Sequence, residues 1–407
     1  MKEQKPEFYT LPNGLRIVHL RNKSEVAHLG ITVLAGSRFE EKNEVGLAHF
    51  LEHCIFKGTK KRRTFHILSR LDAVGGELNA FTSKEEMCVY ASFTKPYLNR
   101  GVELLADIII NSTFPNREIE KEKDVVIDEI NSYMDNPSEH IFDEFEAQIF
   151  ANHPLGNNIL GTKQSVASFQ QEDLIRFTKK FYTPENMVLS VVGPYSLKRV
   201  VESAKKYFGD FENSAASPVP LPFSSYLPTQ KQVNYSNYQS HVVLGGLAFD
   251  LHHDKRLTMA FLTNVMGGPA LNSKLSLAIR EKHGMAYNVE ANYSPFIDSG
   301  YHSIYFGTDK KWVDKSIELI HKELKKMKSL QLNSFKPFEI LDLNLLSFHR
   351  LNILYIFPFD IQFMGSIKGG VSAYRYNPYS GRGVKGFLPK SNACFLFRTL
   401  SFFLSLR

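Results

Sequence analysis

The sequence lacks several features that would assign it to other classes of protein. No stretch of about 18 uncharged apolar residues occurs, so we expect no membrane-spanning helix. The start of the chain, MKEQKPEFYT, lacks the apolar run of a signal peptide, and we therefore expect a cytoplasmic protein. Only three cysteines occur, at unrelated spacings, which argues against both a disulfide framework and a cysteine-based zinc site.

Most of the chain also lacks net charge. The whole sequence carries +7, but residues 335–407 contain nine Lys or Arg against three acids, whereas residues 1–334 contain 40 against 39. A nearly neutral body gives no reason to expect nucleic acid or a membrane surface as a partner. The same terminal segment contains eleven Phe and four Tyr, so the composition changes near residue 335.

What is present is an ordinary globular composition, with 43% hydrophobic and 22% charged residues over 407 positions. This length predicts two or three domains at about 150 residues each. Apolar periodicity and turn residues predict strands at residues 15–20, 28–35, 77–82, 87–94 and 188–192. The same signals predict helices at residues 43–56, 64–74, 96–110, 116–134, 138–150, 171–182 and 196–208.

A segment rich in Pro and Ser, residues 213–230, is typical of a linker and divides the chain into residues 1–212 and 231–407. Patterns in the first part recur in the second at nearly constant offsets. The strand at His28 resembles one at His241, and the helix at Pro96 resembles one near Lys311. We therefore predict two copies of one unit. The repeat fades near residue 330, where Pro337 interrupts an expected helix, so the second domain has an atypical tail from about residue 335.

The most informative segment is His49-Phe50-Leu51-Glu52-His53. On a helix, His49 and His53 lie on one face and can bind one metal ion, and zinc prefers such nitrogen ligands. Glu52 lies beside that ion and can accept a proton from the attacking water, then deliver it to the leaving amine. The alternative is a pair of surface histidines on an ordinary helix. The H-x-x-E-H order is the inverted form of the zincin motif.

A third ligand is expected, since catalytic zinc commonly has three protein ligands. The helix at 116–134 supplies many carboxylates, most of which must face solvent. Glu122, Val126 and Glu129 share one face, but periodicity does not choose among the acids of this helix. The candidates are Glu118, Glu120, Glu122, Asp124, Asp128 and Glu129.

Together these residues resemble the pitrilysin/insulinase family of zinc metallopeptidases, which includes the mitochondrial processing peptidases. The family has H-x-x-E-H followed at a characteristic distance by a glutamate, and the interval from His53 to Glu129 matches that distance. The resemblance extends over residues 8–328, through GLAHFLEH, FKGT and GGELNAFTS. It implies that Glu129 is the third ligand of one Zn²⁺ per chain. It also implies that Glu122 supports catalysis from behind the ligands.

The resemblance further implies a fold and a substrate site. The family fold is α+β, with two homologous domains that each pack a mainly antiparallel sheet with helices and together form a clam-like chamber. Substrate peptides add as a strand beside Asn79, Ala80 and Phe81. Arg280 and Tyr287 match an R-x6-Y element that binds the substrate and stabilises the oxyanion. The alternatives are a plain sheet strand, an exposed arginine and a strand tyrosine.

We therefore expect a zinc-dependent metalloendopeptidase acting on peptides or unfolded polypeptides, paired with itself or with another family member. The competing expectations are a non-catalytic structural or substrate-presenting subunit, and a remnant whose second domain is disrupted. Two departures from the family bear on this choice: Met87 stands where the family often has Thr, and the closing helices are not recognisable after about residue 330. We interpret the tail as the result of a reading-frame change or gene decay, so deletion of residues 335–407 is expected to leave folding unchanged or improved.

Overall fold

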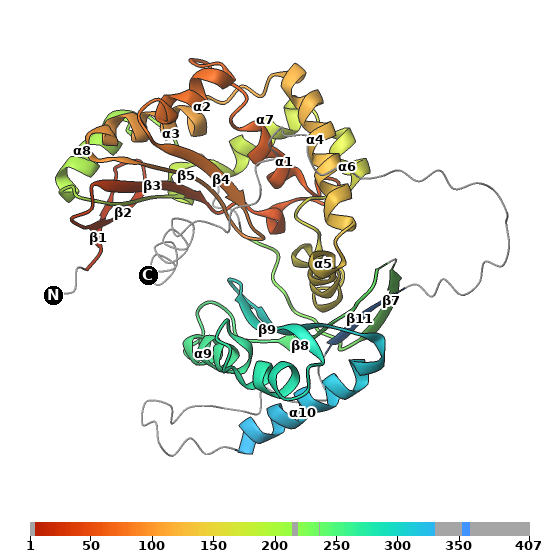
Figure 1. Cartoon of the computed structure of the whole chain (residues 1–407). Helices are drawn as coiled ribbons and strands as arrows, with labels where there is room; N and C mark the ends of the chain where they lie inside the picture. The colour runs from red at the N-terminus through yellow and green to blue at the C-terminus, as the bar shows by residue number, and fades with distance from the viewer. Residues whose placement is uncertain (1–4, 214–218, 236, 330–351, 359–407) are drawn as a thin grey trace, which may run out of the picture.

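The computed structural model describes residues 5–213, 219–235, 237–329 and 352–358. They form two lobes, each a β-sheet packed with helices, and the lobes face each other across helix α5 (Figure 1). The expected α+β class with two domains of mainly antiparallel sheet is confirmed. The division at residues 213–230 stays a prediction, although one sheet lies on each side of it. Within the described ranges no helix is both long and apolar enough to cross a membrane.

The first sheet has the strand order β1-β2-β6-β3-β5-β4, and all neighbours are antiparallel except the parallel pair β2–β6. The run MVLSVVG in β6 is buried along its whole length, as expected for a central strand. Strand β4 occupies the edge of the sheet. The strands are β1 (Glu7–Thr10), β2 (Arg16–Arg21), β3 (Val26–Val33), β4 (Glu77–Thr82), β5 (Met87–Thr94) and β6 (Met187–Gly193).

Eight α-helices belong to the described part of this lobe, and the apolar faces of all of them except α5 form one core with the sheet. The predicted bounds of β4, β5 and α4 are confirmed. The helix predicted from residue 43 begins only at Leu47, because Gly46 adopts a left-handed backbone conformation with φ of +97°. The helices are α1 (Leu47–Cys54), α2 (Thr64–Asp72), α3 (Leu98–Asn111), α4 (Asn116–Met134), α5 (Pro137–Ile149), α6 (Lys163–Ser168), α7 (Gln171–Phe181) and α8 (Leu197–Phe208).

The second sheet repeats the topology of the first. Its order, β7-β11-β8-β10-β9, corresponds strand for strand to β2-β6-β3-β5-β4, and its one parallel pair, β7–β11, corresponds to β2–β6. This agreement supports the predicted internal repeat. The strands are β7 (Gln230–Tyr235), β8 (Ser240–Leu247), β9 (Ala286–Pro295), β10 (Gly300–Thr308) and β11 (Asn352–Pro358). The helices are α9 (Arg256–Gly267), a π-helix (Ser276–Glu281) and α10 (Val313–Ser329).

Strand β11 corrects our expectation about the tail. It lies between β7 and β8 and pairs with both, so residues of the atypical segment supply an inner strand of the second sheet. Deletion of residues 335–407 would remove this strand and leave β7 without its neighbour. The expectation that folding is indifferent to that deletion is therefore wrong on structural grounds. The counterpart of α4, expected near 330–348, lies outside the described residues.

Helix α5 joins the two lobes through an apolar contact. Ile141, Phe145 and Ile149 on this helix belong to one buried cluster with side chains of the second sheet, among them Tyr301. The Tyr301 hydroxyl donates a hydrogen bond to Glu146 Oε1 over 2.6 Å. Burial of large apolar side chains is the dominant favourable term in such contacts, so this helix fixes the lobes against each other.

A buried ion cluster makes a second connection between the lobes. Arg38, whose side chain is fully buried, pairs with Glu85 in the β4–β5 hairpin (2.6 Å) and with Asp298 in the β9–β10 hairpin (2.7 Å). Its guanidinium also donates to the carbonyl oxygen of Leu221 over 2.7 Å. The cluster therefore connects the turn of the β4–β5 hairpin to the turn of the equivalent β9–β10 hairpin in the second lobe.

Candidate metal centre

Helix α1 carries the H-x-x-E-H motif, and its first turn is held by a buried carboxylate. Glu40 accepts hydrogen bonds from the backbone N–H groups of Gly46 (2.9 Å) and Ala48 (2.8 Å), two of the donors that a helix leaves unpaired at its start. Burial raises the pKa of Glu40 to about 8, while these two hydrogen bonds act in the opposite direction. Sequence reasoning missed Glu40, for which the only signal was an acid shortly before a helix.

The side chains of His49, His53 and Glu129 meet between α1 and α4, which lie side by side (Figure 1). Glu129 Oε2 lies 3.3 Å from His53 Nε2 and 3.7 Å from His49 Nε2. Among the described residues this is the one group of three or more His, Cys, Asp or Glu side chains whose ligand atoms lie close together, all within 4.8 Å. The structure thus brings together the three residues that the sequence and its resemblance suggested as ligands.

Glu122, on the same face of α4 as Glu129, holds His53 in place. Its Oε2 lies 3.3 Å from His53 Nδ1, so it can accept the proton of that nitrogen and leave Nε2 facing Glu129. Its Oε1 pairs with Lys57 Nζ at 2.6 Å. A carboxylate behind a histidine fixes the tautomer and raises the basicity of the ligating nitrogen. Lys57 was not among the predicted site residues.

The two histidines have opposite electrostatic environments. Burial, followed by the charge of His53, lowers the pKa of His49 to about 4, so His49 is neutral near pH 7. Burial also acts to lower the pKa of His53, but hydrogen bonds with Glu122 and Glu129 outweigh it and raise the value to about 9. For Glu122 and Glu129 burial acts to raise the pKa, and the contacts with His53 outweigh it and lower the pKa of both.

These residues fit a zinc ion by geometry and by ligand chemistry. Two ligand atoms at about 2.05 Å from a tetrahedral zinc lie about 3.3 Å apart. His53 Nε2 and Glu129 Oε2 show this separation, whereas His49 Nε2 and Glu129 Oε2 are 3.7 Å apart, so His49 would have to shift slightly to complete the arrangement. Two imidazoles and one carboxylate leave one position open, as catalytic sites require. Nδ1 of His49 is buried and finds no hydrogen-bond partner among the described residues, so only His53 is oriented by a hydrogen bond.

Glu52 lies on α1 between the two histidines but does not belong to the ligand group. One polar neighbour on the sheet is Thr82, at the end of β4. Burial raises the pKa of Glu52, and the side chain and backbone of Thr82 act in the opposite direction, to lower it. A carboxyl group with a raised pKa next to a metal site suits proton transfer near neutral pH.

The predicted substrate strand is the last strand of the first sheet in the described part of the chain. Asn79, Ala80 and Phe81 lie in β4, which pairs with β5 on one side only. Thr82 is the last residue of this strand and lies against α1. Its hydroxyl donates to the Ala48 carbonyl oxygen over 3.5 Å, and it also lies near Glu52. An edge strand is the position at which an extended peptide can add to a sheet through backbone hydrogen bonds.

Arg280 and Tyr287 form a pair in the second lobe. The Arg280 guanidinium lies 5.2 Å from the centre of the Tyr287 ring, within the range of a cation–π contact. Tyr287 is 82% exposed, and both side chains border a cavity of about 560 Å³ between α9 and β9. No interaction among the described residues joins either of them to His49, His53 or Glu129, so their link to the metal centre stays a prediction.

Met87, one of the departures noted in the sequence, is accommodated in the core. It is 1% exposed, and the Tyr182 hydroxyl donates a hydrogen bond to its sulfur. Burial raises the pKa of Tyr182, and the nearby charge of Glu52 adds to that shift. The substitution therefore alters packing one layer behind the site and leaves the ligand group intact.

Comparison with known proteins places the chain among peptidases. A family model described as "Insulinase (Peptidase family M16)" matches residues 16–163, and one described as "Peptidase M16 inactive domain" matches residues 168–335. The ligand group and Glu52 all fall in the first match. The second match ends where the composition changes.

Curated relatives are similar over most of their length. An uncharacterized zinc protease of Bacillus subtilis, YmxG, is 36% identical over 324 residues, which cover 79% of this chain and 78% of that protein. An uncharacterized zinc protease of Rickettsia bellii is 35% identical over 320 residues, which cover 77% of this chain and 75% of that protein. A protease structure from Helicobacter pylori superposes with a TM-score of 0.78 at 20% identity, covering 87% of this chain and all of that one. This last likeness supports the fold.

Proposed function

Because the chain belongs to the insulinase family of peptidases, peptidase family M16, we propose that it is a zinc-dependent metalloendopeptidase that hydrolyses peptide bonds in peptides or unfolded polypeptides. The observation that carries this proposal is the meeting of His49, His53 and Glu129 next to Glu52. These residues would hold one Zn²⁺ per chain. When bound, zinc acts as a Lewis acid and lowers the pKa of water.

The protein's own groups carry the proton transfers. Glu52 accepts a proton from the attacking water and later delivers it to the nitrogen of the leaving amine. A positioned acid or base of this kind contributes about 10²- to 10⁴-fold to the rate. Glu122 accepts the Nδ1 proton of His53, so the Nε2 proton is the one that a metal ion would displace. His49 stays neutral because it is buried, so its lone pair is available as a ligand.

Substrate binding is proposed along β4, the edge strand of the described first sheet. A peptide that pairs with Asn79, Ala80 and Phe81 gains backbone hydrogen bonds that demand little of its sequence. Thr82 links that strand to Glu52, so a bound peptide lies within reach of the general base. We assign Arg280 and Tyr287 a role in holding the substrate and the developing oxyanion, for which the support is their pairing at the margin of an open cavity.

The test combines zinc content with cleavage of an internally quenched peptide. Wild type, Glu52→Gln and a control, Glu41→Gln, are compared at equal zinc occupancy; Glu41 is exposed and pairs with Lys180. We expect about one zinc in all three proteins and turnover that falls at least about 100-fold only in Glu52→Gln. Zinc in wild type without turnover would identify a non-catalytic family member. Wild type that binds no zinc would contradict the proposal at its first step.

A further inference from the structure

The loop that follows α1 is fastened to the connection between α3 and α4. Thr59 forms an antiparallel bridge with Ser112. The Lys60 N–H donates to the Asn111 carbonyl oxygen over 2.9 Å, and the Thr113 N–H donates to the Gly58 carbonyl oxygen over 3.0 Å. We call this contact, between residues 58–62 and 107–113, the α1–α4 joint.

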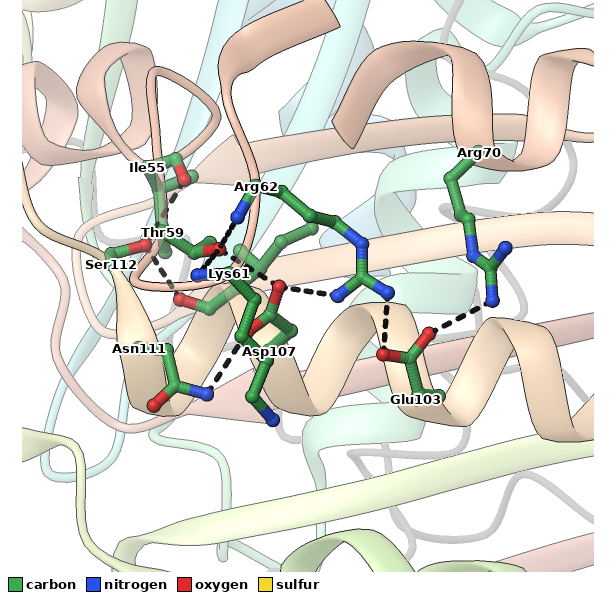
Figure 2. A network of polar contacts seen from close by, with 10 residues as sticks. Ile55, Thr59, Lys61, Arg62, Arg70, Glu103, Asp107, Asn111 and Ser112 are labelled. Carbon is green, nitrogen blue, oxygen red and sulfur yellow. Dashed lines mark hydrogen bonds and ion pairs between the residues drawn. The ribbon is translucent and has the colours of Figure 1, made fainter. Parts of the chain in front are cut away.

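A buried carboxylate lies at the centre of the joint. Asp107, on α3, is 2% exposed and accepts hydrogen bonds from Thr59 Oγ1 (2.9 Å), Arg62 Nη1 (2.5 Å) and Asn111 Nδ2 (3.0 Å). Figure 2 shows these contacts converging on its side chain, with Arg62 reaching on to Glu103. A buried charge is costly unless it is paired, so the charges of Asp107 and Arg62 each depend on the other. Loss of the carboxylate would therefore weaken all of these contacts.

Glu103 is bound in the same network but at its outer side. It pairs with Arg62 Nη2 at 2.7 Å and with Arg70 Nη2 at 3.3 Å. Neither contact reaches the α3–α4 connection (Figure 2). Asp107 and Glu103 therefore share Arg62, but only Asp107 also accepts hydrogen bonds from Thr59 and Asn111.

The joint lies at the ends of the two helices that carry the ligand group. The Ser112 hydroxyl donates to the carbonyl oxygen of Ile55, the C-cap residue directly after α1, over 3.2 Å. Helix α4, which carries Glu129, begins at Asn116, shortly after Thr113. The loop also contains Lys57, which pairs with Glu122 behind His53. A displacement at the joint would therefore move the carboxylates relative to the histidines.

We propose that Asp107 is a positioning residue of the metal centre, which acts by holding the α1–α4 joint and thereby the separation of His53 and Glu129. The inference rests on the metal centre of the proposed function and not on turnover. Sites of this kind tolerate displacements of only about 0.5 Å before function suffers. Asp107 does not touch the ligands, so its effect must be transmitted through the loop and through Lys57.

The test measures metal binding by the intact chain, without substrate. Zinc affinity is determined by competition with a chelator, and the visible absorption of the cobalt-substituted protein reports the ligand geometry. For Asp107→Asn we expect zinc binding about tenfold weaker, at the lower end of the range for residues that orient ligands, and a changed cobalt spectrum. The control, Glu103→Gln, removes the same charge from the same helix and should bind zinc within about twofold of wild type, with an unchanged spectrum.

The outcomes separate this inference from the proposed function. If wild type binds zinc and Asp107→Asn matches it in affinity and spectrum, the inference is wrong while the metal centre stands. If Asp107→Asn only unfolds at a lower temperature, its role is structural and the inference is again wrong. If the variant does not fold, Thr59→Val must still weaken zinc binding and shift the spectrum; it removes the hydrogen bond to Asp107 and the two that Thr59 Oγ1 accepts from the N–H groups of Lys61 and Arg62 within the same loop. Wild type that binds no zinc overturns the metal centre itself.

Discussion

Replacing Glu122 by Gln tests how far the carboxylate behind His53 determines metal binding. The substitution keeps the size of the side chain but removes its charge. Lys57 Nζ, which lies 2.6 Å from Glu122 Oε1 in the wild type, loses its charged partner. His53 Nδ1 is left with a neutral amide, a weaker hydrogen-bond acceptor. We therefore expect the metal-free fold to persist and the zinc affinity to fall.

The magnitude follows from the geometry. Groups that orient a metal ligand typically contribute 10- to 100-fold in affinity, or about 1.4 to 2.8 kcal/mol. The distance from Glu122 Oε2 to His53 Nδ1 is 3.3 Å, longer than the roughly 2.7–2.9 Å of a short charge-assisted hydrogen bond. The lower end of the range therefore applies, and we expect zinc binding about tenfold weaker.

The assay is a competition between the protein and a chelator of known zinc affinity at fixed pH and ionic strength. The matched control is Glu120→Gln, which removes the same charge from the same helix; the Glu120 side chain is 64% exposed and pairs with Lys123 at 2.7 Å. We expect the control to bind zinc like wild type. Equal affinity of Glu122→Gln and wild type, or an equal loss in both variants, would refute the reasoning.

Three further predictions concern the fold. Asp298→Asn removes one partner of the buried Arg38. Because Asp298 is partly exposed, we expect the free energy of unfolding, measured by urea titration, to fall by only about 1–2 kcal/mol and the zinc affinity to stay unchanged. A loss of zinc affinity in variant protein that is still folded would contradict this. Burial lowers the pKa of His302 to about 4 in the folded protein, so unfolding takes up a proton when the pH lies between about 6.5 and 4, and the free energy of unfolding should fall by up to about 3 kcal/mol across that range. His302→Gln should flatten the plot of stability against pH. Parallel plots for the variant and wild type would refute the prediction. A chain that ends at residue 334 loses β11 and should give less folded protein than one that ends at residue 358, so equal yields would show that the second sheet does not need this strand.

Local patterns predicted the parts of the structure that depend on local interactions. The strands β4 and β5 and the helix α4 were predicted from apolar periodicity and from turn residues, and their bounds agree with the structure. The spacing of His49 and His53 places both imidazoles on one helical face, as found here.

The rest depended on contacts between distant segments. Periodicity did not choose among the acids of α4, because Glu122 and Glu129 share a face and both approach His53. Only the resemblance to a known family separated the ligand from its supporting carboxylate. Glu40 and Asp107 act through bonds to other elements, and neither residue belongs to a pattern along its own segment.

Strand β11 shows a third kind of difficulty. Its segment differs in composition from the rest of the chain, and that difference led to the expectation of a dispensable tail. Whether a segment joins a sheet depends, however, on its hydrogen-bonding neighbours and on the pattern of its own few residues. The sequence of β11, NILYIFP, is apolar enough for an inner strand. Composition averaged over residues 335–407 therefore misjudged the role of one short stretch within them.

The most direct measurement of the central claim is an anomalous difference map, recorded at the zinc absorption edge, from crystals of the intact chain grown with one equivalent of zinc. The account predicts one dominant peak about 2.0–2.2 Å from Nε2 of His49, Nε2 of His53 and the Glu129 carboxylate. A peak bound by other side chains, or no peak in protein that is folded and fully titrated with zinc, would contradict it.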